Sequence, residues 1–186
     1  ISWYTYLKMV SWQNLTWLFF HKIAIVHNSN NNKFYQQFFE AFKVILPCSI
    51  CRNHYNKMIE NNKFDIKKNI NNNNLFNWTI DMHNNVNINN GKSAWSYEKA
   101  RRFYKSTYIT TNLTKHFLLN YAFYNYRKGP EKTKQLINMT EAFIFIFPRE
   151  NICLKLIEFN NKFNINKQKY RKWVTAVLLI IKNHMR

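Results

Sequence analysis

The sequence predicts an all-α protein, and three observations lead to that expectation. The 186 residues include only 2 Gly and 3 Pro, so few positions would interrupt a helix. Aromatic residues make up 18% of the chain, which supplies ample material for a core. In several segments the large apolar residues recur every three or four positions, the period of one helix face. We therefore expect long helices packed around an aromatic-rich interior.

Five helices are expected in the first half, at 12–26, 34–46, 48 to about 59, 75–89 and 96 to about 108. Pro47 ends the second, because its ring cannot be accommodated inside a helix. The last of the five opens after Gly91. Asn-rich stretches at 27–33 and 69–74 lack apolar periodicity, and we expect both to be loops.

Four more helices are expected in the second half, at 113–126, 133–147, 150–159 and 167–182. The apolar run at 173–181 is shorter than the roughly 20 residues that a membrane-spanning helix needs. No signal-peptide pattern occurs at the start. From this sequence alone we expect neither a membrane span nor a secretory signal.

The second half repeats three patterns of the first half. EAFKVILP at 40–47 resembles EAFIFIFP at 141–148, NKFDI at 62–66 resembles NKFNI at 161–165, and Trp78 and Trp173 each lead an apolar helix. The offsets stay near one hundred residues, as a duplicated unit would produce. Convergence of Phe-rich helices in a biased composition would produce similar patterns. In the second half, Arg149 and Ile152 occupy the positions that Cys48 and Cys51 have in the first. A duplicated second copy could therefore not perform dithiol chemistry.

The chain is strongly basic, with 28 Lys and Arg against 9 Asp and Glu and a net charge of +19. Such a charge favours contact with anions such as RNA, DNA, acidic membranes or a nucleotide cofactor. The charges are spread along the sequence, however, which is typical of a solvated surface. Three cysteines are too few for a disulfide scaffold.

Two of those cysteines, Cys48 and Cys51, lie three residues apart just after Pro47. A cysteine at a helix start faces free backbone N–H groups and the positive end of the helix dipole, which favour the thiolate. The positive charge of Arg52 adds to this effect. The spacing fits a redox pair, but it also fits two buried cysteines without a role, or the start of a zinc site completed by histidines. The zinc ligands would be His54 with His21, His27 or His83.

Three further patterns surround the dithiol in a fixed order: WQNLTWLFFH at 12–21, WTIDMHNNVNINNGK at 78–92 and SYEKARRFY at 96–104. Together with Pro-Cys-x-x-Cys-x-x-His, they resemble the Erv and augmenter-of-liver-regeneration family of FAD-linked sulfhydryl oxidases. The resemblance covers about 11–104. HNNVN followed by GK, some thirty residues after the dithiol, is its most specific element.

The resemblance implies a fold and a set of site residues. The fold would be a bundle of four to five helices over 1–108 that holds FAD beside the dithiol, with 109–186 as a second helical region. Cys48 and Cys51 would be catalytic. Eight residues would bind the cofactor: Trp17, His21, His54, His83, Asn84, Asn87, Lys92 and Tyr104. Trp12, Trp3, His27 and Trp78 we interpret as packing residues.

The resemblance also implies an activity and partners. Electrons would pass from protein dithiols through Cys48 and Cys51 to FAD and then to O₂, which yields hydrogen peroxide, with no metal. We expect a homodimer or an intrachain pseudo-dimer, and no nucleic acid. The composition is typical of an AT-rich genome, such as that of a large DNA virus, so virus-infected host cytoplasm or the virion is the expected location. The alternative is a basic, zinc-containing, nucleic-acid-binding domain.

Some positions depart from the family pattern. Gln13 stands where many members have a glycine and Asn14 where some have an arginine, so the cofactor contacts of that turn would differ from those of the family. Ile80 replaces a cysteine of a structural disulfide, so we expect that brace to be absent. No second, shuttle cysteine pair occurs in this sequence, and Cys153 alone cannot form one within a chain.

Overall fold

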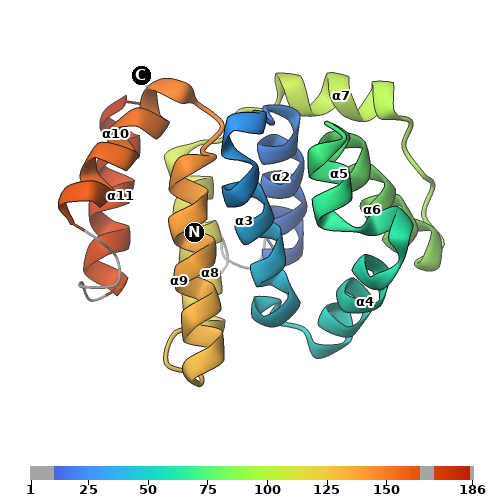
Figure 1. Cartoon of the computed structure of the whole chain (residues 1–186), viewed down its shortest axis with the longest axis horizontal. Helices are drawn as coiled ribbons and strands as arrows, with labels where there is room; N and C mark the ends of the chain where they lie inside the picture. Colours follow the sequence, from blue (N-terminus) through green and yellow to red (C-terminus); the bar gives the residue numbers. More distant parts are fainter. Residues whose placement is uncertain (1–10, 164–169, 185–186) are drawn as a thin grey trace, which may run out of the picture.

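The computed structural model describes residues 11–163 and 170–184, which form helices and no strand (Figure 1). In chain order the α-helices are α2 (Trp12–Ile25), α3 (Asn32–Ile45), α4 (Ser49–Glu60), α5 (Ile66–Asn71), α6 (Leu75–Asn89), α7 (Tyr97–Ser106), α8 (Thr111–Asn125), α9 (Pro130–Phe145), α10 (Glu150–Lys162) and α11 (Tyr170–His184). Two single-turn 3₁₀ helices are η1 (Ser29–Asn31) and η2 (Asn62–Phe64). The all-α prediction is confirmed.

All nine expected helices are present, and the prediction of α6 matches at both ends. The first three residues of the expected helix 167–182 lie outside the described residues. The prediction of a loop at 69–74 was wrong, because α5 runs through Asn71. Asp65 starts α5 by accepting a hydrogen bond from the backbone N–H of Lys68 at 2.6 Å, and Ile66 and Ile70 are buried.

The loop predicted at 27–33 was also wrong in part. It contains η1, and α3 already begins at Asn32. Asn28 starts η1 by accepting a hydrogen bond from the backbone N–H of Asn30 at 3.0 Å. Short polar side chains that bond to nearby backbone can start a helical turn without any apolar periodicity.

Helices α2 and α3 form the centre of the molecule (Figure 1). Helix α3 packs along α9, while α2 contacts α6, α7 and α8. Aromatic rings fill these contacts; the centroids of Phe19 and Phe117, for example, are 4.3 Å apart. The buried apolar residues of α2 through α11 form one contiguous cluster, so the described residues share a single core.

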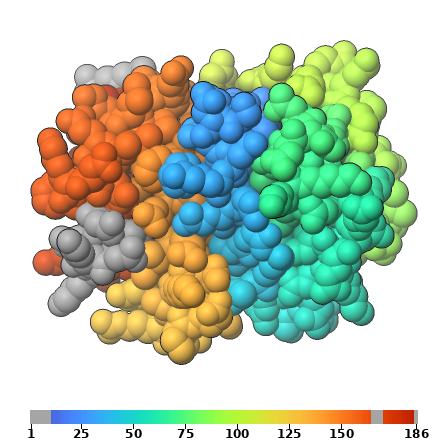
Figure 2. Space-filling view, in the orientation of Figure 1, coloured from blue at the N-terminus to red at the C-terminus, as the bar shows by residue number. Residues whose placement is uncertain are grey.

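The two halves of the chain lie against each other over a broad seam. Figure 2 shows the blue residues of α2 and α3 flanked by the orange α9 on one side and the green α4 to α6 on the other. The division at 108 remains a prediction, since the core continues across it. Among the described helices, none is both long and apolar enough to cross a bilayer.

Candidate redox site at the corner of helices α3 and α4

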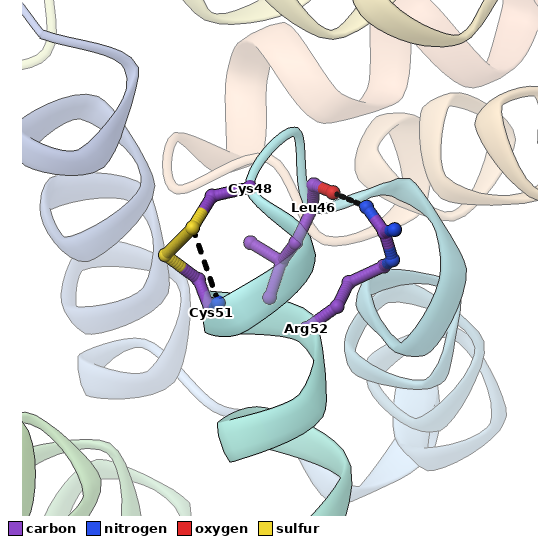
Figure 3. Close-up of a disulfide and its surroundings, with 4 residues drawn as sticks. All are labelled: Leu46, Cys48, Cys51 and Arg52. Atoms are coloured by element: carbon purple, nitrogen blue, oxygen red, sulfur yellow. Dashed lines mark hydrogen bonds between the residues drawn. A yellow bond between two sulfur atoms is a disulfide. The ribbon is translucent and has the colours of Figure 1, made fainter.

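A disulfide joins Cys48 and Cys51 at the corner between α3 and α4 (Figure 3). Cys48 is the N-cap of α4, and its Sγ accepts a hydrogen bond from the backbone N–H of Cys51 at 3.1 Å. The two Cα atoms are 5.2 Å apart, because the first helical turn brings positions three apart together. Pro47 ends α3 and Cys48 starts α4, so the sequence places both cysteines on one turn.

Side chains hold this corner in shape. The last carbonyls of a helix have no partner within it. At the end of α3, Arg52 donates a hydrogen bond to the carbonyl of Leu46 (Figure 3), and Asn56 donates one to that of Lys43 at 3.3 Å. The amide of Asn125, on α8, donates to the carbonyl of Ile45 at 2.9 Å. The turn that carries the disulfide is therefore anchored from two helices.

A cavity of about 370 Å³ lies beside the disulfide, between α2, α4 and α6. Cys51 lines it and Cys48 does not. The full lining is Trp12, Gln13, Asn14, Thr16, Trp17, Phe20, Leu46, Ile50, Cys51, His54, Tyr55, Met58, Met82, His83, Val86, Asn87, Asn90 and Lys92. The volume is within the range of ligand pockets in proteins.

A second cavity, of about 330 Å³, adjoins the first. Its lining is Ile80, His83, Asn84, Asn87, Lys92, Ser93, Trp95 and Tyr104. His83, Asn87 and Lys92 line both cavities. Neither lining contains an Asp or Glu, so both suit an anionic ligand. A ligand long enough to contact both cavities would pass these three shared residues.

Stacked rings form part of the shared wall. The rings of Trp17 and His83 are nearly parallel, with centroids 4.2 Å apart and an interplanar angle of 3°. His21 lies one helical turn after Trp17, and its ring centroid is 5.1 Å from that of His83. The ring of Tyr104 packs against His21 at 4.3 Å. These contacts fix the plane of His83, the ring that reaches both cavities.

A chain of hydrogen bonds behind this wall determines which nitrogen of each histidine carries the proton. The hydroxyl of Thr79 donates to the carbonyl of Phe76 at 2.7 Å, so its oxygen accepts from Nδ1 of His21 at 2.9 Å. Nε2 of His21 then accepts from Nδ1 of His83, also at 2.9 Å. In the neutral state Nε2 of His83 is therefore left as a hydrogen-bond acceptor.

Burial keeps both histidines neutral. It lowers the pKa of His21 well below 6.5, and the neighbouring His83 lowers it further. Burial, with a smaller contribution from Lys92, lowers the pKa of His83 to about 4. At neutral pH the assignment of donors and acceptors in the series of hydrogen bonds from Thr79 to His83 therefore holds.

The end of α6 explains the Asn-Asn-Gly-Lys sequence. Gly91 has φ +69°, a left-handed conformation that only glycine adopts without strain. The N–H of Gly91 bonds to the carbonyl of Ile88 at 3.0 Å, and that of Lys92 bonds to the carbonyl of Asn87 at 2.8 Å. This paired arrangement, a Schellman motif, terminates the helix and turns Lys92 toward the shared wall.

Asn84 fixes the segment that follows. Its amide donates to the carbonyl of Trp95 at 2.8 Å and accepts from the Trp95 N–H, also at 2.8 Å. Asn84 lines the second cavity, but these two bonds give it a structural role there. Lys22 similarly donates to the carbonyl of Tyr104 at 2.8 Å near the end of α7, which holds Tyr104 in place.

The structure brings the ten predicted site residues together. Eight line one or both cavities: Trp17, Cys51, His54, His83, Asn84, Asn87, Lys92 and Tyr104. The other two are bonded to lining residues, Cys48 to Cys51 and His21 to His83. His21 is fully buried and lines neither cavity. It supports the wall through its hydrogen bond to His83.

The interpretation of four residues as packing has a mixed outcome. Trp78 is 1% exposed and donates its indole N–H to the carbonyl of Phe64 at 2.9 Å, as a core residue would. His27 is half-buried and hydrogen-bonded to Asn32 and Asn73. Trp12 packs on the core but also lines the first cavity. Trp3 lies outside the described residues.

Three supporting residues had no signal in the sequence. Thr79 is an ordinary polar residue within a helix, and Tyr121 and Asn125 lie beyond the segment that carries the resemblance. Their partners are 58 to 105 residues away in the sequence. Only the tertiary packing brings these pairs together.

The zinc alternative finds no support in the geometry. Across 11–163 and 170–184, no three His, Cys, Asp or Glu side chains come together as metal ligands would. Cys48 and Cys51 are bonded to each other. The nearby His83 and His21 are occupied with one another.

Comparisons with known proteins agree with this geometry. The sequence is similar to the probable FAD-linked sulfhydryl oxidase R368 of Acanthamoeba polyphaga mimivirus, with 33% identity over 95 residues, 48% of this chain and 65% of the relative. The chain thus spans less than two thirds of that relative's length. No solved structure matches it. The model of the Erv1/Alr family matches residues 14–109, just over half of the sequence. This segment contains the disulfide and every cavity-lining residue except Trp12 and Gln13, so the chain belongs to the Erv1/Alr family.

Proposed function

We propose that the chain is an FAD-linked sulfhydryl oxidase that introduces disulfide bonds into protein substrates. One observation carries the proposal: Cys51, half of a helix-capping disulfide, lines a cavity whose walls also hold Trp17, His83 and Lys92. The mimivirus relative is named for this activity. Because that relative comes from a virus, we also propose that the chain acts in virus-infected host cytoplasm or in the virion.

The residues of the two cavities fit FAD. The Trp17 and His83 rings offer flat surfaces for a flat ring, and Nε2 of His83 offers an acceptor to a ring N–H. Lys92 offers a cation for the diphosphate, without a competing carboxylate in either lining. Asn87 and Tyr104 would contact the nucleotide end, while His54 lies beside Cys51. When bound, FAD would take up the electron pair of the reduced dithiol and pass it to O₂, which yields hydrogen peroxide.

The thiol chemistry itself needs only the two cysteines. A substrate thiolate attacks the sulfur of Cys48, the disulfide breaks, and Cys51 leaves as a thiolate in the cavity wall. The second substrate thiolate attacks the mixed disulfide, which gives an oxidised substrate and a reduced Cys48. The substrate loses two electrons and the cysteine pair gains them. Cys48 serves as the entry point because it lies outside the cavity lining.

The helix start assists this exchange. The N–H of Cys51 points at the Sγ of Cys48, at 3.1 Å, and the positive end of α4 lies there. A Cys48 thiolate released in the second exchange is therefore stabilised. A lower thiol pKa makes a better leaving group, so the cap favours completion of substrate oxidation.

Reconstitution with FAD tests the proposal. The purified chain should become yellow, absorb in the flavin region and consume O₂ when given a dithiol. Cys51→Ala should keep the colour and lose O₂ consumption, while Cys153→Ala should keep both. A chain that binds no flavin, or a Cys51→Ala variant with full activity, would refute the assignment.

We also propose that the C-terminal half is a second, altered copy of the first that packs in place of a partner subunit. Two observations support this. The indole N–H of Trp173 donates to the carbonyl of Phe163 at 3.1 Å, which repeats the bond of Trp78 to Phe64. Helix α3 packs along α9, and these helices carry the matching EAF sequences. A monomeric mass in solution is expected, and a stable dimer would count against it.

A further inference from the structure

Two buried side chains of α8 reach the elements that carry the redox site. Tyr121 and Asn125 lie one helical turn apart and are each 1% exposed. Tyr121 shares a hydrogen bond with the hydroxyl of Thr16 on α2, and Asn125 donates to the carbonyl of Ile45 at the end of α3. Both lie outside residues 14–109, the segment that matches the family.

The Asn125 bond completes the support of the corner. A helix often closes with backbone N–H groups from the residues after it, but Pro47, which follows the C-cap of α3, has none. Side chains instead donate to the carbonyls of Lys43, Ile45 and Leu46. Two of the donors, Arg52 and Asn56, lie on α4 and donate to the carbonyls of Leu46 and Lys43. The amide of Asn125 is the one that ties the corner to another part of the fold.

The Tyr121 bond secures the wall of the first cavity that α2 forms. The hydroxyl of Thr16 donates to the carbonyl of Trp12 at 2.7 Å, so its oxygen is left to accept from the hydroxyl of Tyr121. Thr16 lines the first cavity and immediately precedes Trp17. The ring of Tyr121 also packs against Phe42 of α3, with centroids 5.2 Å apart and an interplanar angle of 88°. One side chain thus contacts both α2 and α3.

We propose that Tyr121 and Asn125 are positioning residues of the redox site. They hold α2 and the end of α3 together, so the two sulfurs keep their separation and Cys51 keeps its place relative to Trp17. The effect on oxidase turnover rests on the proposed function, whereas the effect on the disulfide does not. The candidate site is therefore completed by a helix beyond the family segment.

The second half of the chain supplies matched controls. Thr140 and Tyr170 form a buried hydroxyl pair like that of Thr16 and Tyr121, at 3.0 Å, and line neither cavity. Tyr121→Phe can therefore be compared with Tyr170→Phe. Asn125→Leu can be compared with Thr140→Val, which also removes a buried bond to a carbonyl, that of Leu136.

The first measurement is the equilibrium of the Cys48–Cys51 disulfide in glutathione buffers, read by thiol alkylation and mass without added flavin. Losing one positioning bond lets the sulfurs separate, so the dithiol form should gain about two- to fivefold. The control variants should lose as much stability against urea as the variants they are compared with, but they should leave the disulfide equilibrium unchanged. Equal shifts in a variant and its control, or none in either, would overturn the proposal.

The second measurement is O₂ consumption by the flavin-loaded chain. Tyr121→Phe and Asn125→Leu should lower kcat about two- to fivefold and leave KM for the dithiol unchanged, because the Cys48 face is untouched. If the wild-type chain shows no oxidase activity but the disulfide equilibrium shifts as expected, the proposed function fails and the positioning role stands. Should Asn125→Leu not fold, Tyr121→Phe, which removes only one oxygen, decides the matter.

Discussion

The two halves of the chain place similar sequences at corresponding corners and give them different chemistry. In the first half Pro47 is followed by Cys48, the side-chain cap of α4; in the second, Pro148 is followed by Arg149, the N-cap of α10, which makes no side-chain capping bond. The backbone bond that starts each helix is the same, at 2.9 Å in both. The architecture of the corner therefore does not require cysteine, and the proposed function explains why the first half carries the dithiol.

A second difference lies in what faces the interior. Cys51 is half-buried in a cavity wall, whereas Ile152, at the matching position, is fully buried in the core. Among the described residues, neither of the two cavities beside the dithiol is lined by α10. A redox pair needs open space for a partner beside it, and at the matching position of the second half Ile152 is packed in the core instead.

The largest effect should come from Cys51, the cavity-lining residue that the second half replaces with Ile152. Cys51→Ala should reduce oxidase turnover by about 10³-fold or more, because no sulfur is left to pass electrons into the cavity. Oxygen uptake with a dithiol measures this. Installing cysteines at Arg149 and Ile152 in that variant should not restore turnover. Recovery would show that the second corner can also serve the chemistry.

Trp173→Ala tests how closely the halves depend on one another. The side chain is 1% exposed, so its loss should lower the free energy of unfolding by about 3–5 kcal/mol. Because the core is continuous, circular dichroism in urea should show a single transition shifted as a whole. Two separate transitions would indicate that each half folds alone.

Lys92→Ala should weaken FAD binding about tenfold or more, since a charge-assisted hydrogen bond to the diphosphate is lost. Lys105→Ala, an exposed residue of the same charge outside both cavities, serves as the control. Titration of flavin fluorescence reads the affinity. Equal weakening by both variants would mean that only the general positive charge matters.

Acid should destabilise the fold through His83. Its pKa is lowered to about 4 in the folded chain from an ordinary value of 6.5. The unfolded chain therefore binds more protons between these values, and stability is lost as the pH falls from about 6.5 to about 4. Urea unfolding at several pH values should show this decline, and His83→Gln should reduce it. An unchanged profile in that variant would assign the decline to other groups.

The smallest effect is expected from Thr79→Val. The variant keeps the shape of the side chain but removes the oxygen that accepts from His21. Which nitrogen of His21 and of His83 carries the proton is then no longer fixed. FAD affinity should fall about two- to fivefold, the value of one hydrogen bond. Thr79→Ser should retain the wild-type affinity. A serine variant as weak as the valine variant would argue for packing alone.

Much of this fold could be predicted from the sequence, because its helices carry clear signals. Apolar periodicity gave the bounds of α6, and Pro47 gave the end of α3. Helix α5 was missed because its start depends on one capping aspartate and two isoleucines within an Asn-rich stretch. A six-residue helix is too short for a period to emerge.

The candidate site likewise contains residues that could be predicted from the sequence and residues that could not. Residues that we propose to act through their own chemistry, such as Cys51 and Lys92, lie in short spaced motifs that can be recognised in the sequence. Tyr121 and Asn125 act through partners 105 and 80 residues away. No local pattern records such a pair, since it exists only after the two halves have packed.

Pro47 has one more consequence. Here the proline leaves the closure to Arg52, Asn56 and Asn125, each of which a single codon change can strengthen or remove. The readiness of the sulfurs to give up their bond can thus be adjusted gradually, from positions that never touch a substrate.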